Sequence, residues 1–223
     1  MNLIEYPDRD TQTRSLADTL ATALATALSQ KPRVTFAVPG GTTPGPVFEA
    51  LSTCDLEWSR VHVLLTDERW VPETDAASNA ALIRTRLLTD KAASAPFTPY
   101  YRSDSQIEAA ASALSEALAP QLPIDVLLLG MGADMHTASL FPEAPGLRAA
   151  LSPDAPMFLP VHVAGQANAR LTLSAPALQS ARAIHLLITG AEKRNAVMQA
   201  SSRTTARAPV NCILPQSTVH WSA

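Results

Sequence analysis

The sequence predicts an α/β fold, a doubly wound single domain in which helices cover both faces of a mostly parallel sheet. Two observations lead to this prediction. Short runs of continuous apolar residues, such as 126–129, alternate with stretches in which apolar residues recur at helical spacing. Strands that are apolar throughout are typical of parallel sheets buried between helices. With 223 residues and no internal repeat or low-complexity linker, the chain is expected to form one domain over residues 1–223.

The first half of the chain alternates strands and helices. A strand is expected at 2–6 and a helix at 8–28, and the helix carries a leucine at every fourth position from Leu16 to Leu28 on one face. The β-branched residues of 33–38 predict the next strand. Thr43 is expected to cap a helix whose first turn holds Pro44, where a missing N–H costs nothing.

The same alternation continues to the end of the chain. Further strands are expected at 60–66, 124–130, 157–163, 183–189 and 218–222, with another beginning at Arg170. Further helices are expected at 78–88, at 105–119 and from about Ala191. The histidines inside strands, His62 and His185, are interpreted as packed or edge residues.

Composition excludes several classes of function. A formal net charge of −3 and the lack of any basic run give no support for a nucleic-acid partner. The apolar runs are about strand length, far short of the roughly 20 residues that cross a bilayer, so no membrane partner is expected. Residues 1–10 carry acids and lack a signal-peptide pattern, and Cys54 and Cys212 are interpreted as free buried thiols. A cytoplasmic protein is therefore expected.

The loops that follow the strands are the candidate sites, because ligands of doubly wound sheets bind beyond the carboxyl ends of the strands. Gly40, Gly41, Thr42 and Thr43 lie between a strand and a helix start, where glycine backbone, hydroxyls and helix N–H groups favour a phosphate. An ordinary tight turn is the alternative for this loop taken alone. The loop is neither a Walker A sequence nor GxGxxG, so nucleotide binding is unsupported.

Charged residues follow the third strand. Asp67 is a candidate acid/base or orienting group, and Arg69 is a candidate anion or oxyanion ligand. A solvated strand exit is the alternative. Arg170, at a strand start, and Lys193, in the first turn of a helix, are candidates for binding an anion, although each alone is also compatible with a charge facing solvent.

Asp134 and His136 leave the strand at 124–130 through Gly130–Ala133. A carboxylate beside an imidazole fixes its tautomer and raises its basicity, as a hydrolytic general base requires. Such a pair can also bind a metal, but no HxH, HxxxH or second carboxylate cluster accompanies it, so no metal is expected.

Six segments together resemble a known family, the 6-phosphogluconolactonases. They are PGGTTP (39–44), TDERWVP (66–72), SN (78–79), GMGADMHTASLFP (130–142), RLTLSAPAL (170–178) and TGAEK (189–193). Each lies at an expected strand or helix end, and they occur in the family's order. The resemblance implies a Rossmann-like fold, shared with glucosamine-6-phosphate deaminases. It also implies hydrolysis of 6-phospho-D-glucono-1,5-lactone in the pentose phosphate pathway, without metal or organic cofactor.

Residue roles follow from the matched motifs. His136 would be the general base, Asp134 would orient it, and Asp67 and Arg69 would contact the sugar and the developing oxyanion. The 6-phosphate would be held by Gly40, Gly41, Thr42 and Thr43 together with Arg170 and Lys193.

Met135 stands where the family usually has glycine. Either the backbone there has a positive φ, with a strain of about 1–2 kcal/mol, or the thioether crowds the pocket. A deaminase or isomerase, which would have Asp-Glu-Tyr rather than Asp67-Glu68-Arg69, remains an alternative, as does a catalytically silent sugar-phosphate binder. A small-molecule partner and a monomer or weak homo-oligomer are expected.

Overall fold

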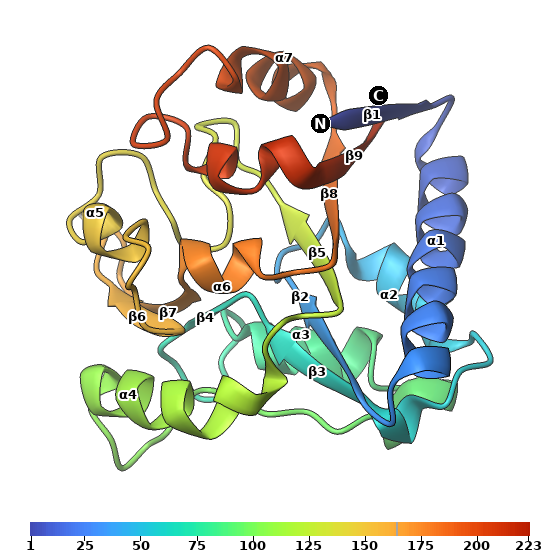
Figure 1. Cartoon of the computed structure of the whole chain (residues 1–223), viewed down its shortest axis with the longest axis horizontal. Helices are drawn as coiled ribbons and strands as arrows, with labels where there is room; N and C mark the ends of the chain where they lie inside the picture. Colours follow the sequence, from blue (N-terminus) through green and yellow to red (C-terminus); the bar gives the residue numbers. More distant parts are fainter. Residues whose placement is uncertain (164) are drawn as a thin grey trace.

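A six-stranded sheet, parallel throughout, forms the centre of the molecule (Figure 1). The computed structural model describes residues 1–163 and 165–223. The strand order is β1-β9-β8-β5-β2-β3. The strands are β1 (Asn2–Tyr6), β2 (Val34–Val38), β3 (Val61–Leu65), β5 (Val126–Gly130), β8 (Ala183–Thr189) and β9 (Ser217–Ser222). The predicted mostly parallel sheet is therefore confirmed, with strands close to their expected positions.

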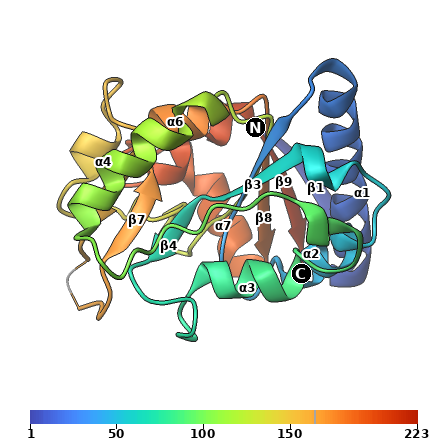
Figure 2. The same ribbon diagram turned by 90° about the horizontal axis from the view of Figure 1, so that it is seen from below.

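Helices cover both faces of this sheet, as predicted. Figure 2 shows α2 and α3 on one side and α4 and α6 on the other. The α-helices are α1 (Arg9–Gln30), α2 (Gly45–Ser52), α3 (Asn79–Arg86), α4 (Ile107–Leu118), α5 (Leu147–Ala150), α6 (Ala175–Gln179) and α7 (Ala191–Ala200). Short 3-10 turns occur at η1 (Trp58–Arg60), η2 (Asp90–Ser94), η3 (Ala119–Gln121), η4 (Pro209–Cys212) and η5 (Leu214–Gln216).

The longest helix, α1, forms for local reasons. Asp8 accepts a hydrogen bond from the Thr11 N–H and so caps the helix at its first turn. Leu16, Leu20 and Leu24 are fully buried, and Leu28 nearly so, which confirms the expected apolar face.

A second, antiparallel sheet was not predicted. It contains β4 (Asp67–Arg69), β7 (Arg170–Leu173) and β6 (Phe158–Val161), in the order β4-β7-β6. It lies on the side of the molecule away from α1 (Figures 1 and 2). The sequence indicated strands near 157–163 and at Arg170 but gave no sign that 67–69 is a strand. Pro160 is accommodated because β6 is at the edge of this sheet.

The expectation that Thr43 caps a helix was wrong. Helix α2 begins at Gly45 with Pro44 as its N-cap residue. A threonine cap at position 43 would bond the N–H of the second or third following residue, but the third, Pro46, has no N–H, and the second, Gly45, donates elsewhere. The Gly45 N–H donates instead to the Thr42 carbonyl, at 3.3 Å.

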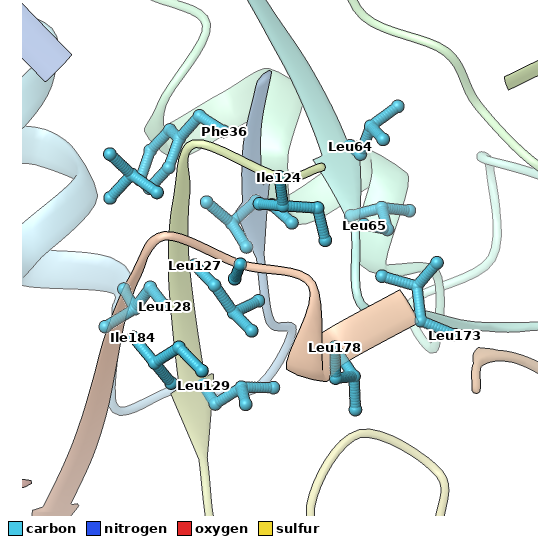
Figure 3. Close-up of a cluster of buried hydrophobic side chains, with 14 of the residues drawn as sticks. Phe36, Leu64, Leu65, Ile124, Leu127, Leu128, Leu129, Leu173, Leu178 and Ile184 are labelled. Atoms are coloured by element: carbon cyan, nitrogen blue, oxygen red, sulfur yellow. The ribbon is translucent and has the colours of Figure 1, made fainter. Parts of the chain in front are cut away.

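The core continues from the large sheet to the small one. Figure 3 shows Leu127 and Leu129 of β5 in one cluster with Leu65 of β3, Leu173 of β7 and Leu178 of α6. The chain passes between the sheets within a single residue, Thr66, whose carbonyl accepts a hydrogen bond from the Leu173 N–H at 2.9 Å. The loops after the parallel strands are therefore held next to β4 and β7.

Two other expectations concern thiols and membranes. Cys54 and Cys212 are both free, as predicted, although Cys54 is only partly buried. Burial raises the pKa of the Cys212 thiol to about 12. Within the described residues, no helix has both the length and the apolarity that crossing a membrane requires.

Candidate active site

Four neighbouring parallel strands, β8, β5, β2 and β3, end at the same edge of the sheet. From β2 the chain moves outward to β3 and then returns to β5 on the other side, so the direction of winding changes between β2 and β5. A pocket of about 210 Å³ opens there. It is lined by Pro39, Gly40, Gly41, Thr43, Pro44, Asp67, Arg69, Asn79, Leu129, Gly130, Met131, Gly132, His136, Ala138, Arg170, Leu187 and Lys193.

Most of the predicted site residues meet in this pocket. Two do not line it directly. Thr42 lines an adjacent hollow together with Arg9 and Thr189. Asp134 does not line the pocket but pairs with His136, which does. The loops chosen from the sequence therefore meet at one pocket, and the fold decides which side chains of each loop line it.

The glycine-rich loop offers its backbone to the pocket. In the part of the chain that the structure describes, the N–H groups of residues 40–43 have no intramolecular hydrogen-bond partner. Such free amides at a strand-to-helix turn are suited to bind an anion. Position 40 also has no room for a side chain, because a Cβ there would lie 1.8 Å from Oδ1 of Asn79.

Asp134 and His136 form a close pair. Nδ1 of His136 lies 2.6 Å from Oδ1 of Asp134, and the His136 backbone N–H donates to the same oxygen at 3.2 Å. A carboxylate accepts only, so Nδ1 carries the proton and Nε2 is left as an acceptor. Gly132 makes room for the pair, since a Cβ there would lie 2.2 Å from Nδ1 and 2.4 Å from Oδ1.

The backbone at Met135 makes this pairing possible. Its φ is 70°, a left-handed conformation, and the turn is closed by hydrogen bonds from Met135 N to Gly132 O (2.9 Å) and from Gly132 N to His136 O (3.0 Å). The Met135 side chain is buried in the core, 3% exposed, and does not line the pocket. Of the two possibilities left open by the sequence, positive φ holds and pocket crowding does not.

Phe141 links the histidine loop to the small sheet. Its ring lies against the imidazole of His136, with centroids 4.5 Å apart and planes at 34°. The guanidinium of Arg170 lies over the same ring at 5.3 Å. The general-base candidate and an anion-binding candidate thus contact a single aromatic side chain.

The register of the small sheet places two arginines together. Arg69 of β4 pairs directly with Arg170 of β7. Like charges on directly paired residues destabilise a sheet. Burial lowers the pKa of Arg170; Asp67 opposes this shift, and Arg69 adds to it. An anion bound between the two guanidinium groups would offset their repulsion.

Asp67 is held by three groups from different segments. Its Oδ2 accepts from the Ser139 hydroxyl at 2.5 Å and lies 3.8 Å from Nη1 of Arg170. Its Oδ1 lies 3.3 Å from the Thr66 hydroxyl. The carboxylate is 6% exposed, so this buried charge depends on these partners.

Two residues beside Asp67 were missed as contributors to the site. The amide of Asn79 lines the pocket and donates to the Asp67 carbonyl at 2.8 Å. The buried carboxylate of Glu68 accepts from the backbone N–H groups of Arg69, Asn79 and Ala80 and from the Ser78 hydroxyl, so it anchors the start of α3. Burial raises the pKa of Glu68, against the opposing effect of these donors. The signal for Asn79 is its place in the SN motif, and that for Glu68 is its place among the three consecutive charges 67–69, but neither residue was given a role from the sequence.

Lys193 lies where it was predicted, in the first turn of α7, and lines the pocket. The positive end of the α7 dipole faces the same edge of the sheet, so Lys193 adds a cation where an anion is already favoured.

Among residues 1–163 and 165–223, no group of three or more His, Cys, Asp or Glu side chains is arranged to hold a metal ion.

Comparison with known proteins points to one family. Residues 7–221 match the family described as glucosamine-6-phosphate isomerases/6-phosphogluconolactonase. The chain is 42% identical to a 6-phosphogluconolactonase of Pseudomonas aeruginosa, over 94% of this chain and 90% of that protein. The crystal structure of a 6-phosphogluconolactonase from Shewanella baltica superposes with a TM-score of 0.95 at 32% identity, covering 100% of this chain and 98% of the other.

A monomeric glucosamine-6-phosphate deaminase superposes with a TM-score of 0.83, covering 100% of this chain and 97% of its own. Its sequence identity is 18%, so this likeness shows a shared fold alone. The matched family spans nearly the whole sequence, and the relatives above cover it at both sequence and structural level. The chain therefore belongs to the glucosamine-6-phosphate isomerase/6-phosphogluconolactonase family.

Proposed function

We propose that this chain is a single-domain carboxylic ester hydrolase that converts 6-phospho-D-glucono-1,5-lactone to 6-phosphogluconate, a step of the pentose phosphate pathway. The observation that carries the proposal is the Asp134–His136 pair, at 2.6 Å, beside a loop of free backbone amides in one pocket. Relatives named 6-phosphogluconolactonase at up to 42% identity support the same reaction.

His136 acts as the general base. Asp134 fixes Nδ1–H, so Nε2 accepts a proton from water as the water oxygen attacks the lactone carbonyl carbon. The bond between that carbon and the ring oxygen then breaks. His136 returns its proton to the ring oxygen, which leaves as the sugar hydroxyl, and the product is a carboxylic acid that ionises. A lactone is an activated ester, so the scheme needs no metal or organic cofactor.

The glycine-rich loop and two cations bind the phosphate. The backbone N–H groups of residues 40–43 and the hydroxyl of Thr43 hold the 6-phosphate, and Arg170 and Lys193 balance its charge. Thr42 faces an adjacent hollow, so its contribution comes from the backbone N–H.

Asp67 and Arg69 contact the sugar and the carbonyl group in our scheme. Asp67 accepts from a sugar hydroxyl, and Arg69 stabilises the negative charge that develops on the carbonyl oxygen. In the described residues the Nε of Arg69 is buried without a hydrogen-bond partner, while one terminal nitrogen donates to the Ala77 carbonyl at 2.6 Å. Because Nε is buried, a ligand oxygen would contact Arg69 through its terminal nitrogens, where the side chain lines the pocket.

The proposed setting follows from the same features. The substrate is a small molecule, the formal net charge of −3 gives no basis for a nucleic-acid partner, and we propose a cytoplasmic monomer or weak homo-oligomer.

The decisive test is a hydrolysis assay with the purified chain. Loss of 6-phosphogluconolactone should exceed its spontaneous hydrolysis, and glucosamine 6-phosphate should release no ammonia. A chelator should leave the rate unchanged. Ammonia release without lactone hydrolysis would replace the proposal by deamination, and phosphosugar binding without either reaction would indicate a silent binder.

A further inference from the structure

Ser139 belongs to the same loop as His136 but takes no part in the chemistry proposed above. It is 1% exposed, and its hydroxyl donates to Oδ2 of Asp67 at 2.5 Å. Its backbone N–H donates to Oγ1 of the buried Thr172 at 3.1 Å. Thr172 pairs with Asp67 across β7 and β4. The Ser139 hydroxyl is therefore fixed in position by the small sheet and directed at one carboxylate oxygen.

The nearest cation to that oxygen is Arg170, whose position is set by other contacts. Its Nε donates to Oε1 of Gln166 at 2.9 Å, and its planar face lies over Phe141. Its Nη1 is 3.8 Å from Oδ2 of Asp67, beyond the range of about 2.7–3.2 Å for an N–H···O hydrogen bond. Within the described residues, its terminal nitrogens make no hydrogen bond, which leaves them to the pocket.

This arrangement resolves a conflict between two charges. Asp67 is a buried carboxylate, and a buried carboxylate gains most from a direct, bidentate contact with an arginine. Such a contact would neutralise Arg170 and use the donors that a substrate phosphate needs. The hydroxyls of Ser139 and Thr66 supply the hydrogen bonds of Asp67 instead, so the guanidinium of Arg170 stays in ion-pair range without a hydrogen bond to that carboxylate.

We propose that Ser139 is a positioning residue that holds Asp67 back from Arg170 and thereby keeps the guanidinium free to bind the anionic group of the substrate. The identity of that anion as a sugar phosphate rests on the function proposed above. The control of Arg170 by Ser139 does not, because inorganic phosphate probes it directly.

The first experiment measures phosphate binding by calorimetry. Ser139→Ala removes the hydroxyl and keeps the backbone bond to Thr172. Asp67 then turns to Arg170, and the Kd of inorganic phosphate and of 6-phosphogluconate should rise about tenfold, as expected for the loss of one favourable charged contact. Ser217→Ala is the matched control, because Ser217 is a buried serine whose hydroxyl donates to the Leu214 carbonyl away from the pocket. Its Kd should not change.

A double-mutant cycle separates positioning from a general structural effect. In an Asp67→Asn background, residue 67 has no negative charge that could pair with Arg170. Ser139→Ala should therefore leave the Kd of phosphate unchanged in that background. Ser139→Cys, which keeps nearly the same volume with a weaker donor, should raise the Kd less than Ser139→Ala and serves if the alanine variant does not fold.

Kinetics add an independent readout. In Ser139→Ala the KM for the lactone should rise by a factor similar to that of the phosphate Kd, with a smaller change in kcat. An unchanged phosphate Kd in the folded variants, or an equal rise in the Asp67→Asn background, would overturn the proposal. Absence of lactone hydrolysis by the unaltered chain would refute the proposed function alone, since the phosphate cycle would still test Ser139.

Discussion

His136 and His220 are the same side chain in opposite surroundings. His136 is 30% exposed, lines the pocket and pairs with the carboxylate of Asp134. His220 is fully buried in β9, between the Tyr6 hydroxyl at 2.8 Å from Nδ1 and Nδ1 of His185 at 3.1 Å from Nε2. Burial, and to a lesser degree the neighbouring His185, lowers the pKa of His220 to about 4.

The difference teaches what makes a histidine available for chemistry. Both nitrogens of His220 are occupied by neutral partners, and among the described residues no carboxylate pairs with it, so it is a packed, neutral group. His136 has one nitrogen fixed by a carboxylate and the other open to the pocket. The backbone differs too: His220 lies in a regular strand, whereas His136 follows Met135 with its φ of 70°.

The largest expected effect is the loss of activity in His136→Ala, compared with a histidine that also lies near a carboxylate but outside the pocket. His136→Ala should lower kcat for lactone hydrolysis by roughly 10²–10⁴, because it removes the general base. His162→Ala is the matched control: His162 is also exposed and near a carboxylate, 3.6 Å from Glu108, but does not line the pocket. Its kcat should stay near that of the unaltered chain. Near-normal turnover in a folded His136→Ala variant would eliminate His136 as base.

The next effect concerns the pH dependence of stability. Between pH 6.5, the ordinary pKa, and about 4, the unfolded chain binds a proton at His220 that the folded chain does not. The stabilisation is thus complete above pH 6.5 and is lost as the pH falls toward 4, by up to about 3 kcal/mol in free energy of unfolding.

This loss is measured by urea unfolding at a series of pH values for the unaltered chain and for His220→Gln. The glutamine variant should show a smaller fall in unfolding free energy across that window, because it has nothing to protonate at this position. Equal slopes for both proteins would mean that His220 does not titrate as its burial requires.

The smallest expected effect is the difference in stability between two variants at Met135, about 1–2 kcal/mol. Met135→Ala should cost about 2–5 kcal/mol, because a buried side chain is lost while the left-handed backbone is retained. Met135→Gly loses the same side chain but relieves about 1–2 kcal/mol of backbone strain, so it should be more stable than the alanine variant. Thermal unfolding compares the two. A glycine variant that is less stable than alanine, or one whose KM falls, would contradict a strained residue outside the pocket.

Much of the fold was predictable because its signals are local. The leucines of α1, the β-branched run of β2 and the apolar run of β5 each specify an element through residues a few positions apart. The small sheet was not predictable in this way. Strand β4 has three residues, too few for a periodic pattern, and it pairs with β7 about a hundred positions later in the chain.

The contacts of the candidate site also differ in how far the sequence predicted them. Asp134 and His136 are two positions apart, and their pairing was predicted from that spacing. The contacts of Asp67 with Ser139, and of Glu68 with the start of α3, were not predicted, because they join segments that only the folded chain brings together. The mistaken cap at Thr43 was a local error, since Pro46 lacks an N–H and only that of Gly45 could have bonded such a cap.

The sequence by itself determined which chemical groups stand at the ends of the strands, and parallel strands bring those ends to one edge of the sheet. Only the tertiary structure decided that Arg69 lies opposite Arg170 and that His136 is open while His220 is buried. Strand register and burial are set by packing between segments that are distant in sequence. The residues of a short motif do not determine which distant segment packs against it.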